Sequence, residues 1–182
     1  MPRWFTLANL FTLSRMALVP MIVHAILEGR NVTALELFLA AAVTDVIDGG
    51  LARGFGQATR SGAYLDPIAD KILLSGIFLG LGATGAVPWW LVAIVLGRDI
   101  FILLGVLVLL ALTKVKKFPP SRWGKISTFV QIATVVTFLV KNIWDVSVFQ
   151  AIAATMIWVC AAFTLWSGAH YAIRSTQTLR AH

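Results

Sequence analysis

Six apolar stretches constrain the fold of this chain more than any other feature, because each is close to the length that a helix needs to cross a bilayer. A crossing helix takes about 20 residues. Lipid offers the backbone no hydrogen-bond partners, so a crossing segment of this length must be helical. We therefore predict an all-α integral membrane protein with six transmembrane helices, over residues 9–28, 33–54, 62–84, 87–112, 125–143 and 147–172.

The composition agrees with a chain that is mostly surrounded by lipid. Only 13% of the residues are charged, whereas soluble domains average about 25%. The length of 182 residues predicts one membrane domain over residues 1–182. Asn9 and Arg15 interrupt the first apolar stretch and no cleavage site follows it, so we expect no removable signal peptide. The single cysteine, Cys160, excludes a disulfide within the chain and is expected to pack as a small apolar side chain.

Lys and Arg residues outside the apolar stretches gather on one side of the predicted membrane. Only Arg30 and Lys141 lie on the other side, while Arg15, Lys71 and Arg98 fall within stretches. The positive-inside rule makes the basic side cytoplasmic and places both termini there, as in a multi-pass protein of the bacterial inner membrane. The net charge of +7 then serves orientation and anionic lipid head groups, and no nucleic acid partner is expected. The residues on the basic side are Arg3, Arg53, Arg60, Lys114, Lys116, Lys117, Arg122, Lys125, Arg174 and Arg180.

Two glycines four residues apart, Gly76 and Gly80, lie on one face of the third predicted helix. Small residues at this spacing allow two helix backbones to approach closely. We expect a close helix contact within the monomer, with a contact between two copies of the chain as the alternative.

Four of the eight acidic residues fall in a window of 26 residues. Asp45 and Asp48 are three residues apart and Asp66 and Asp70 are four apart, so each pair shares a helix face. The two helices are predicted antiparallel neighbours joined by a short turn, and their acidic ends can converge at the cytoplasmic side. Four carboxylates in a low-dielectric site repel one another or take up protons unless a cation neutralises them. Oxygen ligands favour Mg²⁺, Mn²⁺ or Ca²⁺ over zinc, and four carboxylates suit two metal ions.

Residues between the two acidic pairs fit a phosphate-bearing ligand. Gly49 and Gly50 lie inside a predicted helix, where each glycine costs about 1 kcal/mol relative to alanine. That cost is understandable if a ligand or a helix must approach the backbone there. Ala52 keeps the same face clear, and Arg53 is placed to bind a pyrophosphate.

Two other interpretations of the acidic window stay open. The acids could form buried salt bridges with Arg53, Arg60 and Lys71, which would leave one acid unmatched. They could also serve a cation carrier without enzymatic activity. Enzymatic turnover that depends on a divalent cation would separate an enzyme from a carrier.

The window resembles the signature of the CDP-alcohol phosphatidyltransferase family, D-x₂-D-G-x₂-A-R-x₈-G-x₃-D-x₃-D. The resemblance extends beyond the window, to two motifs of phosphatidylglycerophosphate and cardiolipin synthases. One is N-x-x-T-x-x-R-x-x-x-x-P near the N-terminus and the other is G-K-x-x-T-x-x-Q. The window matches at Asp45, Asp48, Gly49, Ala52, Arg53, Gly62, Asp66 and Asp70, and the motifs match at Asn9, Thr12, Arg15, Pro20, Gly124, Lys125, Thr128 and Gln131.

The resemblance implies a six-helix fold, usually dimeric, with a polar cavity open to the cytoplasm, and a phosphatidyl transfer from CDP-diacylglycerol that releases CMP. It implies two divalent cations, Mg²⁺ or Mn²⁺. Asp70 is implied to share in metal binding and to act as the base that takes the proton of the acceptor hydroxyl, and Arg15 to reach the cavity or a lipid head group. The other implied metal ligands are Asp45, Asp48 and Asp66, and the residues implied to accommodate CDP are Gly49, Ala52, Arg53 and Gly62.

The acceptor alcohol is a separate question, for which glycerol 3-phosphate is favoured. Its compact dianion needs cations, and Arg98, Lys125 and Arg122 are the candidates. Arg98 and Asp99 could instead form a buried ion pair, and Lys125 could mark the cytoplasmic interface. Phosphatidylglycerophosphate synthases commonly carry Arg-Glu where this chain has Arg98-Asp99, so a cardiolipin synthase that uses phosphatidylglycerol is the close alternative. Another alcohol acceptor is also open.

Overall fold

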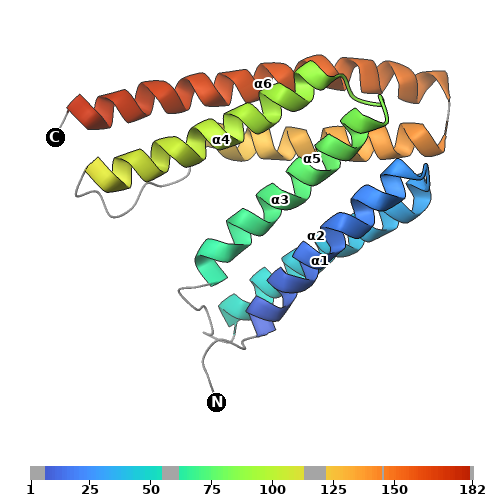
Figure 1. The fold of residues 1–182 in the computed structure, drawn as a ribbon, viewed down its shortest axis with the longest axis horizontal. Helices are drawn as coiled ribbons and strands as arrows, with labels where there is room; N and C mark the ends of the chain where they lie inside the picture. The colour runs from blue at the N-terminus through green and yellow to red at the C-terminus, as the bar shows by residue number, and fades with distance from the viewer. Residues whose placement is uncertain (1–6, 55–61, 113–121, 145, 181–182) are drawn as a thin grey trace. The chain divides into compact units, whose positions relative to one another are not determined.

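The computed structural model describes residues 7–54, 62–112, 122–144 and 146–180, with side chains described for 13–44, 68–106, 122–144, 146–174 and 176. The described residues form six helices, in the order and close to the positions predicted (Figure 1). The all-α prediction is therefore confirmed. The helices are α1 (Leu7–Leu27), α2 (Asn31–Gly54), α3 (Gly62–Ala83), α4 (Trp89–Leu112), α5 (Arg122–Ile143) and α6 (Ser147–Arg180).

The end of α6 differs most from the prediction, which placed it at residue 172. The helix continues to Arg180. Residues 173–180 contain neither glycine nor proline, the residues that most often end a helix. Apolar length predicts where a helix can lie in lipid, but it does not fix where the helix itself stops.

The turn after α1 shows why the chain reverses where it does. The amide of Gly29 donates to the carbonyl of Ile26 at 3.1 Å, and that of Arg30 donates to the carbonyl of Ala25 at 2.9 Å. This pair of bonds is the Schellman arrangement, which needs a left-handed residue just past the helix end. Gly29 supplies it with a φ of 72°. The predicted break between the first two helices is thus confirmed.

The unit that contains α1, α2 and α3 is built on two contacts of α1, one with α2 and one with α3. A Cβ atom added to Gly76 would lie 2.8 Å from Cγ1 of Val19, and one added to Gly80 would lie 3.6 Å from Cγ1 of Val23. The predicted close packing of this glycine pair within the monomer is confirmed. Because each contact advances by four residues on both helices, α1 and α3 run in the same direction. The buried core beside this seam consists of Ile22, Ala25, Ile26, Phe38, Ile77, Phe78 and Leu81.

A second unit contains α4, most of α5 and α6. In it α4 packs against α6, and the ring of Tyr171 comes so close to Gly105 that a Cβ there would lie 2.8 Å from it. The rings of Trp90 and Trp158 contact each other at a tilt of 37°, with their centroids 5.4 Å apart. Cys160 is buried, as expected for a small packed side chain. The aliphatic core of this unit includes Leu91, Val92, Val95, Val135 and Leu139.

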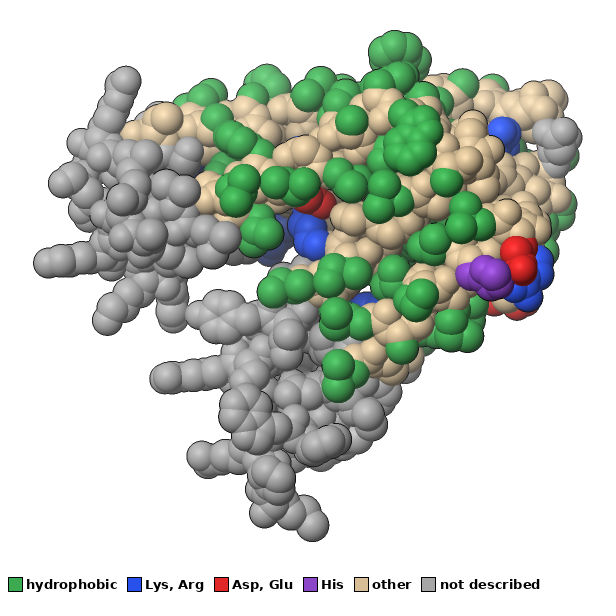
Figure 2. Space-filling view, in the orientation of Figure 1, with side chains coloured by type: hydrophobic (Ala, Val, Ile, Leu, Met, Phe, Trp, Pro, Cys, Tyr) green, Lys and Arg blue, Asp and Glu red, His purple; other side chains and the backbone are tan. Residues whose placement is uncertain are grey.

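Three of the helices, over the residues searched, are long and apolar enough to cross a membrane: Trp89–Val106, Arg122–Ile143 and Ser147–Arg174. Leu13–Leu27 and Asn31–Thr44 are shorter apolar helical segments. Many large apolar side chains are exposed, among them those of Phe129 and Trp158. Apolar side chains are spread over much of the described surface in Figure 2. Contiguous apolar surface of this kind is unfavourable in water and is expected where lipid surrounds the helices.

The α1–α3 seam yields a stability prediction. Gly76→Ala must displace Val19, and overpacking typically costs about 1–3 kcal/mol. Gly97→Ala is the matched control, since a Cβ at Gly97 meets nothing within 4 Å. Both changes gain about 1 kcal/mol of helix propensity, so the difference between them isolates the contact. We expect a lower free energy of unfolding for Gly76→Ala, measured by denaturant titration in mixed micelles. Equal values would contradict close α1–α3 packing.

Candidate active site

The acidic window lies on two helices, as predicted. Asp45 and Asp48 belong to the last part of α2, and Asp66 and Asp70 to the first part of α3. Of the four acids, only the side chain of Asp70 lies within the described region. The side chains of the other predicted metal-binding and CDP-binding residues lie outside that region. These residues are Asp45, Asp48, Gly49, Ala52, Arg53, Gly62 and Asp66. Their metal and CDP roles stay predictions.

Arg15 of α1 makes an ion pair with Asp70 of α3. Its Nη1 atom donates to Oδ1 of the carboxylate at 2.5 Å. The two side chains differ sharply in exposure, with 2% for Arg15 and 46% for Asp70. The arginine is thus enclosed by helices, while the carboxylate reaches open space. The observed partner of Arg15 is Asp70 at the candidate site, and the expectation that Arg15 reaches a cavity or a lipid head group stays a prediction.

The register of the α1–α3 seam explains why Arg15 meets Asp70. Val19 lies on Gly76, and Arg15 is one helical turn earlier on the same face of α1. Helical side chains lean toward the N-terminus of their own helix. A long arginine side chain therefore reaches past the level of residue 72 to Asp70.

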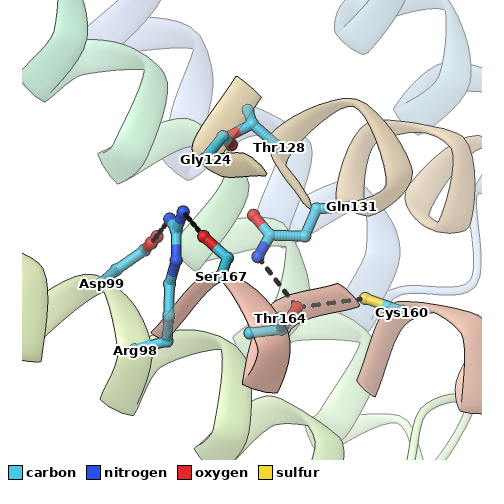
Figure 3. A network of polar contacts seen from close by, with 8 residues as sticks. All are labelled: Arg98, Asp99, Gly124, Thr128, Gln131, Cys160, Thr164 and Ser167. Atoms are coloured by element: carbon cyan, nitrogen blue, oxygen red, sulfur yellow. Dashed lines mark hydrogen bonds and ion pairs between the residues drawn. The ribbon is translucent and has the colours of Figure 1, made fainter. Parts of the chain in front are cut away.

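Arg98 is held in a buried ion pair in the unit of α4, α5 and α6 (Figure 3). Its Nη1 donates to Oδ1 of Asp99 at 2.7 Å, and its Nη2 donates to Oγ of Ser167 at 2.7 Å. Both charged side chains are almost fully enclosed. The ion pair was one of two interpretations of these residues, and it is observed. Acceptor binding by Arg98 stays a prediction.

A buried polar seam between α5 and α6 was missed by the sequence analysis. Nε2 of Gln131 donates to Oγ1 of Thr164 at 3.3 Å, and the thiol of Cys160 lies 4.0 Å from the same oxygen (Figure 3). The signal was present, because polar residues on each helix recur at the spacing of one helix face. They are Ser127, Gln131 and Thr134 on α5, with Cys160, Thr164 and Ser167 on α6.

Arg122 and Lys125 open α5 and are exposed. They are three residues apart and so lie on one side of the first turn. Cations at a helix N-terminus oppose the helix dipole, so they do not serve the stability of α5. An orientation signal and an anion site both fit them, and their predicted acceptor role stays a prediction.

Comparisons with known proteins identify the same family that the acidic window resembles. The model of the CDP-alcohol phosphatidyltransferase family matches residues 5–166. A protein of Mycobacterium tuberculosis H37Rv named "Probable phosphatidylglycerophosphate synthase" is 36% identical over 95% of this chain and 83% of its own length. A Bacillus subtilis 168 protein named CDP-diacylglycerol–glycerol-3-phosphate 3-phosphatidyltransferase is 31% identical over 97% of this chain and 98% of its own. A Drosophila melanogaster protein named "Probable cardiolipin synthase (CMP-forming)" is 35% identical over 77% of this chain and 48% of its own.

The chain therefore belongs to the CDP-alcohol phosphatidyltransferase family, and the family suggested by its motifs is confirmed. It is an enzyme of phospholipid biosynthesis, and its helices suit a membrane protein.

The buried ion pair gives a stability prediction for this unit. Asp99→Asn keeps the shape of the side chain and removes the charge that faces the Arg98 guanidinium. A hydrogen bond to a charged group contributes roughly 1.5–3 kcal/mol, and we expect a loss of that size in the free energy of unfolding in micelles. Glu36→Gln, at an exposed position of α2, is the matched control and should change stability by less than about 0.5 kcal/mol. A loss for Asp99→Asn no larger than that of the control would contradict this prediction.

Proposed function

We propose that the chain transfers the phosphatidyl group of CDP-diacylglycerol to glycerol 3-phosphate and releases CMP. The acceptor hydroxyl oxygen bonds to the phosphorus that carries diacylglycerol, the pyrophosphate bridge to CMP breaks, and the hydroxyl proton passes to a base. The observation that carries this proposal is the acidic window on α2 and α3, in a chain that matches the Bacillus glycerol-3-phosphate enzyme over nearly the full length of both.

The donor chemistry of the window fits two divalent cations, Mg²⁺ or Mn²⁺. The family generally uses divalent metal ions. The four acids offer oxygen ligands alone, which hard cations prefer. Asp45, Asp48 and Asp66 would hold the metals, with Asp70 shared. The cations would neutralise the charge of the pyrophosphate and of the departing CMP.

Residues of the chain itself would accept the proton and bind the CDP portion of the donor. Asp70 accepts the proton of the attacking hydroxyl, and its half-exposed carboxylate is accessible for this. Arg53 pairs with the pyrophosphate of the bound CDP portion. The small residues Gly49, Ala52 and Gly62 leave room for that portion against the helix backbones.

Glycerol 3-phosphate brings a second anionic group that the acceptor residues would recognise. Arg122 and Lys125 are exposed, lie within one turn and carry charge that α5 does not need for its own stability. Arg98 is the third candidate, and its guanidinium is already bound by Asp99 and Ser167. Lys125 and Arg122 are therefore the stronger candidates for the phosphate.

The proposal includes the placement of the chain in the bacterial inner membrane. One domain over residues 1–182 would cross it six times, with both termini and a polar cavity facing the cytoplasm, and would act as a homodimer. The distribution of Lys and Arg and the three long apolar helices support this placement.

A cardiolipin synthase is the second candidate, and two observations favour it. Arg98 is followed by Asp99 rather than glutamate, and the Drosophila relative bears that name. Phosphatidylglycerol also needs a lipid-facing opening for its acyl chains. An apolar groove between α5 and α6 could accommodate acyl chains, because its lining is apolar. The lining residues are Trp123, Ala162, Phe163 and Trp166.

A purified-protein assay tests the main proposal. CMP release from CDP-diacylglycerol should require glycerol 3-phosphate, stop with a chelator and return with Mg²⁺ or Mn²⁺. Asp70→Asn should lower kcat by about 100-fold or more, the size typical of a lost general base. Glu36→Gln controls for loss of a carboxylate elsewhere. Cardiolipin formation from phosphatidylglycerol would favour the second candidate, and use of another alcohol in the panel would identify a third. Metal transport without CMP release would indicate a carrier.

Lys125→Ala tests the acceptor assignment. The change should raise the KM for glycerol 3-phosphate and leave the KM for CDP-diacylglycerol nearly unchanged. A contact with a phosphate contributes roughly 1.5–3 kcal/mol, which corresponds to about 10–100-fold in kcat/KM. Lys141→Ala, at the other end of α5, is the matched control. Equal kinetics for the two variants would remove Lys125 from the acceptor site.

A further inference from the structure

The Arg15–Asp70 pair joins a buried cation to a half-exposed anion, and this asymmetry is unusual for a purely structural contact. Arg15 is 2% exposed, whereas the Asp70 side chain is 46% exposed. A charge among apolar helices is expensive. An apolar residue at position 15 would fill the α1–α3 seam without that cost. The cost calls for a reason that lies at the exposed end of the pair.

We propose that Arg15 is a positioning residue that fixes the orientation of the Asp70 carboxylate for the transfer reaction. This inference rests on the proposed role of Asp70 as metal ligand and base. Arg15 acts through Asp70 and is not itself assigned a contact with substrate. Arg15 matches the N-terminal motif of the resemblance, and it lies on a different helix from the four acids.

The packing of α1 against α3 holds the Arg15 side chain in a fixed position. Its Cα sits one turn from the contact of Val19 with Gly76, where α1 and α3 are too close for even a Cβ atom without displacement. Its guanidinium is enclosed, and a guanidinium keeps its charge at every physiological pH. Oδ1 of Asp70 therefore meets a donor whose position and charge are fixed by the packing of α1. Loss of this donor would remove that constraint on Oδ1.

A conservative change at position 15 should separate positioning from charge. Lysine keeps the charge but offers a compact ammonium on a more flexible stem. It should support the carboxylate less well than arginine and better than an uncharged glutamine. The expected order of kcat is wild type, Arg15→Lys, Arg15→Gln.

A stability measurement in chelator tests the pair without catalysis. Asp70→Asn removes the observed negative charge that faces the buried guanidinium, whereas Arg15→Gln leaves a carboxylate that solvent can reach. Breaking a buried pair from the exposed side should therefore lower Tm by about 5 °C or more, and Arg15→Gln should lower it less. The double variant Arg15→Gln/Asp70→Asn should lose less Tm than the sum of the two single losses. Additive losses would show that the two side chains do not depend on each other, and would overturn the proposal.

Kinetics on the full-length protein test the positioning role. Arg15→Gln should lower kcat by about tenfold or more, since a misplaced catalytic group loses rate without losing substrate affinity. The KM for CDP-diacylglycerol should change little. Arg15→Lys should recover part of the loss. Arg30→Gln is the matched control, because Arg30 forms an exposed ion pair with Glu28 that should contribute little.

A double-mutant cycle distinguishes action through Asp70 from an independent effect. Asp70→Glu shifts the carboxylate relative to the Arg15 guanidinium. In that background, Arg15→Gln should therefore lower kcat only slightly further. Losses that multiply would overturn the proposal, as would wild-type kcat in Arg15→Gln. If Arg15→Gln does not fold, the cycle is run with Arg15→Lys and the same criterion applies. Inactive wild-type protein in every acceptor assay would instead refute the proposed function and leave the Tm cycle as the test of the pair.

Discussion

The cost of a charge among apolar helices governs how this chain uses its buried arginines. A guanidinium cannot shed its charge, so each one enclosed by helices needs a partner. Arg15 finds Asp70 on another helix, and Arg98 finds Asp99 next to it together with Ser167 on α6. In both cases the rest of the local packing is arranged so that the partner lies within hydrogen-bonding distance. The helix contacts and the polar contacts therefore depend on one another.

The two pairs differ in the exposure of their acids, and the difference separates their possible roles. Asp70 is half exposed, while Asp99 is almost as enclosed as its arginine. A carboxylate that reaches open space can exchange protons or bind ions, whereas one closed off on every side serves the bundle. The same residue types thus leave chemistry possible at one place and serve packing at the other. Exposure of the acid, more than the presence of an ion pair, decides which role is available.

The helices could be predicted because hydrophobic length and helical hydrogen bonding are local properties of the chain. The glycine pair at Gly76 and Gly80 marked a close approach of helices for the same reason. The partner of Arg15 could not be predicted, because it depends on the register between α1 and α3, which only the packed structure provides. The Gln131–Thr164 contact was missed although both residues lie on regular polar stripes. Recognising a stripe on one helix does not reveal the stripe that faces it.

The candidate site was predictable in part, and the division follows the chemistry of the two substrates. Carboxylates at fixed helical spacing specify a cation and a pyrophosphate, whatever alcohol is used. The alcohol must be recognised by other residues, and relatives named for different acceptors share similar identity with this chain. Because Arg98 is already neutralised by Asp99, a dianionic acceptor would depend mainly on cations that remain exposed, and Arg122 and Lys125 at the start of α5 are such cations. A fixed acid signature combined with a variable set of surface cations would let one fold serve several acceptor alcohols.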